Sequence, residues 1–527
     1  MAEKTQAAPN PKEILEEALM NGGDAENLNE TVIVDTSDGA VDGQEKCPLC
    51  GATDISLNVN TGKLRCNFCR HEFEPKKIKG MEEDLSNLKG KIVGSGAQDI
   101  IADTKDMVTL KCQSCGAEVV IDTAAAAQAR CHWCRNTLSL NQQIPNGAIP
   151  DVVLPFKIKK DDAKSEIEKF VGSRKFFAHP KFKKEFTTDN IMGVYFPYML
   201  VDVKGHATLE GVGEHEKRRY EVGSGDDKET RYDVDVYEVS RKFDITIKEL
   251  SIESSSDRLN TADKEKTNNI INSIMPFDTE NCVKWNANYI KGYTSERRDT
   301  NVEQLENLVM AQSRDVAKFK VNDTLTKFDR GVRWDTNRLD VEGQQWKAAY
   351  LPVWLYSYQQ KKGDKGLLHY IAVNARTKET MGSVPIHMPK LFGISAIIEI
   401  IGLMIMLFVD FGEDFDYEWA FLLPGILFFA AIYMRYRNSN ARHTYEDETE
   451  AKIENLISDE RYIKTNKGVS ESSMVGANNR SLEGSNSNGI IGDSINNVNL
   501  STDVLDALGD DSAVSDFLKS SIKKFSK

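Results

Sequence analysis

The apolar stretch LFGISAIIEIIGLMIMLFV, Leu391–Val409, decides the layout of this chain. Its nineteen residues carry one charge, at Glu399. A helix of this length reaches roughly 29 Å, close to the hydrocarbon thickness of a bilayer. A second apolar run, AFLLPGILFFAAIYM at Ala420–Met434, follows an acidic, aromatic turn. The pattern predicts a transmembrane α-helical hairpin over residues 390–435, with a hairpin buried in a soluble core as the alternative.

The charges around the two runs predict their orientation. Lys390, Arg435, Arg437 and Arg442 lie on one side, whereas the connecting turn carries only acidic residues. Under the positive-inside rule, both termini are then cytoplasmic. The N-terminus has no basic start followed by an apolar run, so we expect no cleavable signal peptide. The expected location is the cell membrane, as a multi-pass protein with two helices.

Glu399 lies near the centre of the first run, where an acid costs about 2.5–3.5 kcal/mol on insertion scales. Ser395, Glu399 and Gly402 share one helical face, and small residues beside a polar one favour close helix contact. We therefore predict that this face self-associates or contacts a membrane partner. The alternatives are a protonated carboxyl group, a helix shifted toward an interface, and a single tolerated acid.

Eight of the nine cysteines form four CxxC pairs, and Cys282 stands alone. Fifteen residues separate the pairs within each of two units, 47–74 and 112–138, which share the frame CxxCGA and then RCx(Phe/Trp)CR. Four thiolates at this spacing predict one tetrahedral Zn²⁺ per unit, whereas redox pairs do not explain two matched units. His132 lies inside the second unit, but four thiolates already complete the coordination of zinc, so we do not expect it to be a ligand. The predicted ligands of the two structural zinc sites are Cys47, Cys50, Cys66, Cys69, Cys112, Cys115, Cys131 and Cys134.

These units resemble zinc ribbons of the TFIIB type, in CPLCG at Cys47–Gly51 and RCNFC at Arg65–Cys69. Basic residues and Phe68 in the first ribbon would suit contact with a nucleic acid. Lysines and arginines beside a formally negative zinc–thiolate centre also serve to neutralise it. The net charge of the chain, −14, argues against a general nucleic-acid coat. A structural or protein-docking role is the main expectation, and nucleic-acid binding the alternative.

Residues 150–389 are expected to form an α+β cytoplasmic body with two related halves. Tyr195–Val203 and Tyr350–Tyr358 both begin Tyr-apolar-Pro and then have the pattern of strands. Each follows a helix-like segment, Asp161–Val171 or Val302–Phe319. The run RYDVDVYEVSRKFDITIKEL between them alternates as strands do.

A second resemblance covers roughly Cys47 to Arg437. Tyr350–Tyr358, Tyr370–Ile386 and Asn281–Tyr293, together with the adjoining membrane stretch, resemble bacterial membrane proteins with a TFIIB-type zinc ribbon. Members of that family are often encoded beside SPFH-domain or phage-shock-like proteins, which implies a membrane adaptor in envelope homeostasis. The duplicated ribbon and the long C-terminal tail depart from that pattern.

The remaining segments complete a multidomain layout. We expect a disordered acidic lead at 1–46 and a linker at 75–111. A helical segment at 436–466 and a flexible Ser/Asn/Gly-rich linker at 467–500 should follow the membrane hairpin. The end, 501–527, has the pattern of a C-terminal amphipathic helix, with Val514, Phe517, Leu518, Ile522 and Phe525 on one face.

The sequence contains no P-loop, GxSxG elbow or HExxH motif. We therefore expect no enzyme, no catalytic residues, and Cys282 as a small buried hydrophobe. The predicted function is a zinc-stabilised membrane scaffold or adaptor that recruits protein partners, with homo-oligomerisation open. The alternative is a membrane-tethered protein that binds nucleic acid through the first ribbon.

Overall fold

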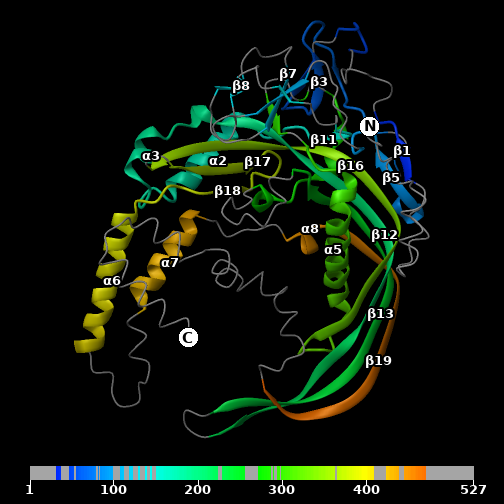
Figure 1. The fold of residues 1–527 in the computed structure, drawn as a ribbon, viewed down its shortest axis with the longest axis vertical. Helices are drawn as coiled ribbons and strands as arrows, with labels where there is room; N and C mark the ends of the chain where they lie inside the picture. The colour runs from blue at the N-terminus through cyan, green and yellow to red at the C-terminus, as the bar shows by residue number, and fades with distance from the viewer. Residues whose placement is uncertain are drawn as a thin grey trace, which may run out of the picture.

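The computed structural model describes most of the chain between Thr31 and Ser470 (Figure 1). The described ranges are 31–36, 47–52, 55–78, 81, 84–98, 107–111, 118–122, 129–130, 137–138, 143–144, 150–223, 228–255, 271–286, 289, 293–296, 298–362, 365–408, 423–437 and 444–470. The described residues that fall within 107–144 and 359–368 are described by backbone alone. The architecture is a mixed α+β body with one large sheet.

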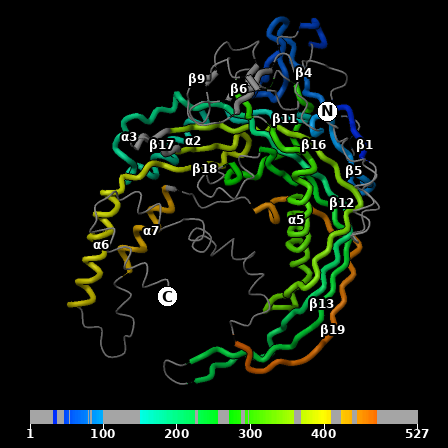
Figure 2. Tube along the Cα trace, viewed as in Figure 1, coloured from blue at the N-terminus to red at the C-terminus, as the bar shows by residue number. Residues whose placement is uncertain are grey.

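Four long strands form the main part of the sheet: β12 (Met192–Val222), β13 (Glu229–Glu253), β16 (Val332–Lys362) and β19 (Glu450–Ser470). They pair antiparallel in the order β16-β12-β13-β19. A straight strand of 31 residues, the length of β12, would reach roughly 100 Å. Figure 1 shows these strands bent into an arc, and Figure 2 follows the same curve along the Cα trace.

Bulges account for part of the curvature. The β12–β16 register shifts at Lys204/Gly205 and at Glu210/Gly211. A Cβ on Gly205 would lie 2.6 Å from the carbonyl oxygen of Asp340, so a side chain does not fit there. Glycine thus lets two backbones approach where the strand bends.

Shorter strands extend the sheet. β1 (Thr31–Val34) and β5 (Gly90–Gly94) run parallel to each other, and β5 runs parallel to β16. The other members are β6 (Met107–Lys111), β7 (Glu118–Asp122), β10 (Gln143–Ile144), β11 (Val152–Val153), β14 (Val283–Lys284), β15 (Thr294–Glu296), β17 (Lys365–Asn374) and β18 (Thr380–Gly382). Fourteen of the described strands belong to this one sheet.

The two Tyr-x-Pro strands pair with each other at the centre of the sheet. Tyr195 lies opposite Pro352, and Pro197 lies opposite Tyr350. Helix α2 (Lys160–Gly172) precedes β12, with the short helix α3 (Pro180–Glu185) between them, and α5 (Val302–Val321) precedes β16. Each strand continues into an antiparallel partner, β13 or β17. This arrangement is what two related halves would produce, with a local twofold axis near the pair Phe196 and Leu351.

The two largest hydrophobic clusters of the described residues lie against the sheet. The first contains Ile167 and Phe170 of α2 with Tyr195, Trp354 and Tyr356 of the central strands. The second contains apolar residues of α5 packed on β12, β13 and the fully buried Trp346 of β16. The predicted helices and central strands are therefore confirmed, because each places one apolar face against the sheet.

Helix α6 (Met388–Phe408) leaves the body almost directly after β18 and packs beside α7 (Pro424–Arg437). Within the part of the chain that the structure describes, α6 alone is long and apolar enough to span a membrane. The remaining short helices are α3 (Pro180–Glu185), α8 (Tyr445–Glu448) and 3-10 turns at Leu85–Asn87, Thr188–Asn190, Asn272–Ile274, Thr279–Asn281 and Asn322–Thr324.

Four of the predicted segments are wrong where the structure describes them. Within the described part of the predicted helical segment 436–466, the helical residues are the last two of α7, Tyr436 and Arg437, and the short helix Tyr445–Glu448. Strand β19 replaces the rest and continues into the predicted flexible linker as far as Ser470. The predicted linker 75–111 contains β5, and the predicted disordered lead contains β1, both members of the sheet. Local pattern missed these strands because their pairing partners are distant in sequence. The predicted C-terminal helix at 501–527 lies outside the described residues.

Candidate metal centre

Four cysteines of the first predicted ribbon meet at one point. The Sγ atoms of Cys47, Cys50, Cys66 and Cys69 all lie within 4.8 Å of one another. Two of the separations, Cys47–Cys69 and Cys50–Cys66, are 3.6 Å. A tetrahedron of sulfur atoms at 2.3 Å from zinc has edges of about 3.8 Å. This group could hold a metal ion, and its geometry is compatible with Zn²⁺.

Two matched turns present these thiols. The N–H of Gly51 donates to the carbonyl of Cys47 at 2.9 Å, and the N–H of Arg70 donates to the carbonyl of Cys66 at 2.9 Å. Gly51 has φ +73° and Arg70 has φ +62°. The first value fits the glycine expected at this turn. The second is adopted by an arginine, which the sequence pattern did not identify as a left-handed position.

A small sheet brings the two turns together. β2 (Ile55–Asn58), β3 (Lys63–Cys66) and β4 (Glu72–Phe73) are antiparallel, with Ile55 opposite Cys66. Ile55 and Leu64 are fully buried, and both belong to the core that contains α2. The first ribbon is therefore packed onto the body, although its own apolar core is small.

The backbone also favours the thiolate form of one ligand. The N–H of Cys69 points at the Sγ of Cys66 at 3.5 Å. This interaction lowers the pKa of Cys66 to about 7. Because the thiolate is the form that binds a metal, the turn prepares this side chain for coordination.

The second predicted ligand set, Cys112, Cys115, Cys131 and Cys134, lies outside the described residues, as do Gly116 and His132. The structure describes the backbone of nearby strands. β6 and β7 form a hairpin, and β8 (Ala129–Arg130) pairs with β9 (Thr137–Leu138). Through β7, this region joins the main sheet at β15.

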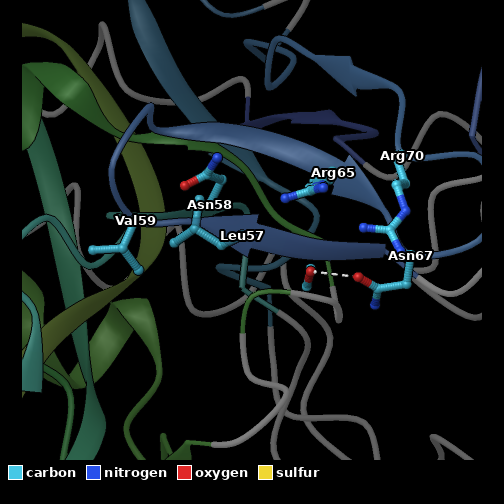
Figure 3. A pocket seen from close by; sticks show the side chains of 7 residues that line it. Leu57, Asn58, Val59, Arg65, Asn67 and Arg70 are labelled. Atoms are coloured by element: carbon cyan, nitrogen blue, oxygen red, sulfur yellow. Dashed lines mark hydrogen bonds between the residues drawn. The ribbon is translucent and has the colours of Figure 1, made fainter.

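The outer surface of the first ribbon is apolar at its turns and basic beside them. Leu49 and Phe68 occupy the same position in their CxxC pairs, and they are 68% and 80% exposed. The same ribbon carries an open hollow of about 430 Å³, shown in Figure 3. It is lined by Ser56, Leu57, Asn58, Val59, Arg65, Asn67 and Arg70. Two guanidinium groups and several amide or hydroxyl groups could contact an anion there.

The predicted contact face of α6 does meet another helix, but that helix belongs to the same chain. Ser395 and Gly402 are buried, and Glu399 Oε2 accepts a hydrogen bond from the N–H of Gly425 at 2.8 Å. Gly425 is the second residue of α7. A helix N-terminus attracts carboxylates through its free backbone N–H groups, and the side-chain pattern does not reveal such a partner.

Buried charges elsewhere in the body form ion pairs across strands. Lys347 Nζ lies 3.1 Å from Asp202 Oδ2 and 3.7 Å from Glu249 Oε1. Cys282 packs near this group as a partly buried hydrophobe, and burial raises the pKa of its thiol. Such a thiol is a poor nucleophile, in keeping with the packing role expected for it.

Comparisons with protein-family models, curated proteins and solved structures find no match to this chain.

Proposed function

We propose that the protein is a membrane-anchored, zinc-stabilised scaffold that recruits partner proteins to the membrane. The observation that carries this proposal is the direct attachment of an apolar helix to the body. The N–H of His387 donates to the carbonyl of Phe177 at 2.7 Å, and Leu391 in the first turns of α6 is buried in the core beside α2. A membrane helix joined in this way would hold the whole body close to the bilayer.

The end of α7 supports the same anchor. The N–H of Phe177 donates to Tyr436 Oη at 3.1 Å, and Arg174 Nε donates to the carbonyl of Arg435 at 3.0 Å. The start of α6 and the end of α7 thus contact the same part of the body. Both helices then enter and leave on one side, as a hairpin requires.

We assign the membrane segment as a two-helix hairpin with both termini in the cytoplasm. The exposed apolar residues of α6 and of α7, among them Ile400, Leu407 and Leu427, would face lipid. A cysteine introduced at Gly412 should react with an impermeant reagent from outside intact cells, and one at Ser487 should not. The reverse labelling pattern, or labelling at neither position, would contradict the assignment.

We also assign a structural Zn²⁺ to Cys47, Cys50, Cys66 and Cys69, and a second to the matching cysteines at 112–134. All four thiols in a structural site are occupied by the metal, so no position remains for a substrate or a catalytic water. The role of zinc here is to hold the two turns of the ribbon and their exposed residues in place.

The exposed pair Leu49 and Phe68 is our proposed docking surface for a protein partner. Large apolar side chains at rigid turns are common anchors in protein interfaces. We propose that the partners belong to envelope homeostasis, among them SPFH-domain or phage-shock-like proteins. This part rests on the resemblance in Tyr350–Tyr358 and Tyr370–Ile386.

A crosslinking purification from native membranes tests the docking surface. Proteins recovered with the parent chain should be lost with L49S/F68S and kept with V222S, a matched change at another exposed apolar residue. The zinc content should stay the same in all three. Identical recovery from all three proteins would contradict the docking role.

A second candidate function is nucleic-acid binding at the first ribbon. The hollow beside Arg65 and Arg70 is the observation that favours it. Binding of the full chain in detergent to single-stranded DNA or RNA should then weaken as salt increases, and R65E/R70E should abolish it. Absence of binding at low salt would exclude this function.

A further inference from the structure

β19 lies at the edge of the large sheet with one side open. Among the residues that the structure describes, it pairs with β13 alone. Most of its 21 residues are exposed. An edge strand of this length presents a row of backbone donors and acceptors that can pair with another strand. Charged side chains on an edge strand normally prevent such pairing. The positions of the charges along β19 therefore decide which strands could pair with it.

The centre of β19 is regular and partly apolar. Register shifts against β13 fall on either side of Ile457–Tyr462, and the pairing is continuous between them. Ile457 is 64% exposed and Tyr462 is 53% exposed. A further pair, Leu456 and Ile463, is 39% and 47% exposed. Ile457 and Ile463 lie three residues to either side of Glu460, which suits a strand that pairs with a copy of itself about that residue.

Acidic residues predominate in the first half of β19, and basic residues occur in its second half. Residues 450–460 contain four acidic residues and one lysine, whereas residues 461–470 contain three basic residues and no acidic residue. Parallel addition of an identical strand would place like charges together. Antiparallel addition would place the acidic half opposite the basic half. Charge repulsion therefore disfavours parallel pairing of two copies of β19, and charge attraction favours antiparallel pairing.

We propose that β19 is a self-association surface, at which two copies of the chain pair antiparallel about a twofold axis near Glu460. A twofold contact puts the same surface on both copies. With the axis at Glu460, Asp459 of one copy lies opposite Arg461 of the other. If the axis lay at Asp459 instead, the two Asp459 carboxylates would face each other and repel. Charge therefore favours the register centred on Glu460.

The charge of Glu460 itself is compensated within its own chain. Glu460 Oε1 accepts from Arg241 Nη2 at 2.7 Å, and Oε2 accepts from Lys327 Nζ at 2.9 Å. Two copies of this carboxylate can therefore lie near the axis without an uncompensated negative charge. The contact would join two sheets into one continuous sheet.

A charge exchange in the full-length chain tests the proposal. D459K places a lysine opposite Arg461 of the other copy, and R461D places an aspartate opposite Asp459. Each variant alone should therefore dimerise about tenfold more weakly than the parent. A mixture of the two variants pairs the new lysine with the new aspartate and leaves Asp459 opposite Arg461, so it should recover the dimer. Sedimentation in detergent, and co-purification of two tagged copies after crosslinking in membranes, measure the effect.

R333D and D335K are matched controls, since these residues have the same spacing on β16 and are similarly exposed. They should leave the dimer unchanged. A monomeric parent chain, a dimer unaffected by both β19 variants, or a mixture that fails to recover would overturn the proposal. So would a dimer seen in detergent but not in membranes. A dimer that forms only after residues 471–527 are removed would also overturn it, because the chain's own tail would then occupy the edge.

Discussion

Glu399 Oε2 accepts a hydrogen bond from the N–H of Gly425, 26 residues away, at 2.8 Å. The carboxylate thereby satisfies a backbone donor at the start of α7, where no intrahelical acceptor exists. The positive end of the α7 dipole also favours a negative charge there. A residue that looked costly within the apolar run of α6 is therefore the contact that positions the second helix.

Enlarging Gly425 should separate the two helices. A Cβ at this position would lie 2.7 Å from Glu399 Oε2 and would also meet the carbonyl of Ser395. G425A should lower the free energy of unfolding by about 1–3 kcal/mol, the usual cost of overpacking. Thermal unfolding in detergent measures the change. G393A is the control, because a Cβ on Gly393 meets nothing within 4 Å. Equal melting of both variants would contradict the close approach.

Replacing Glu399 should separate its effect on insertion from its effect on packing. E399L removes the acceptor for Gly425 and should weaken the α6–α7 contact by about 0.5–2 kcal/mol, the range for loss of a helix cap. Membrane insertion should be unchanged or improved, since an acid leaves the apolar run. E399Q keeps an acceptor oxygen and should retain most of the contact. Crosslinking between the two helices and a membrane-fraction assay measure the two effects. If leucine and glutamine behave alike, the hydrogen bond is unimportant.

Elemental analysis should find two zinc ions per purified chain. C66S should bind one ion and lose the other, because three thiols cannot complete the tetrahedral site. Its first ribbon should become sensitive to protease, since so small a core depends on the metal. C282S should keep both ions. A metal-free parent protein, or disulfides between the paired cysteines, would contradict the zinc assignment.

Acid should loosen β19 before it affects the central strands. Thr465 Oγ1 donates to Asp235, and Asn455 Nδ2 donates to Asp244, and these contacts lower the pKa of both carboxyl groups below their usual 3.8. A lowered folded-state pKa contributes stability above the unfolded value, which is lost as pH falls through the folded value.

Hydrogen exchange of the β19 amides, corrected for intrinsic rates, should therefore rise a few-fold below about pH 3.8. The amides of β12 serve as the internal reference. D235N should respond less to acid, since it removes one of the titrating carboxyl groups that contact this strand. An unchanged exchange rate at β19 across this range would show that these carboxylates do not hold the strand.

Short-range patterns predicted part of this structure well. The spacing of Cys47, Cys50, Cys66 and Cys69 predicted a cluster of four thiols that could hold a metal ion, because each CxxC turn is local and a hairpin brings the turns together. The Tyr-x-Pro strands and the helices before them were also predicted. Apolar residues that alternate with polar ones indicate a strand with one buried face, and apolar residues at helical spacing indicate a helix with one buried face. The second cysteine set remains a prediction.

Long-range pairing was not accessible to the same reasoning. The segment EAKIENLISDERYI has the composition of a helix, yet it forms β19 because β13 offers an open row of backbone partners more than 200 residues away. β1 and β5 were likewise expected to be disordered or a linker. Propensity is a weak preference that tertiary hydrogen bonding overrides.

The sequence by itself determined the thiol cluster and the apolar length of α6, because both depend on residue type and on spacing within a few turns of chain. Tertiary structure alone decided that Tyr195 lies opposite Pro352, that β19 forms an edge of the sheet beside β13, and that the backbone of Gly425 meets Glu399. Each of these joins residues far apart in sequence through backbone groups. Every residue except proline carries the same backbone donor and acceptor, so the side-chain pattern does not reveal which ones will pair.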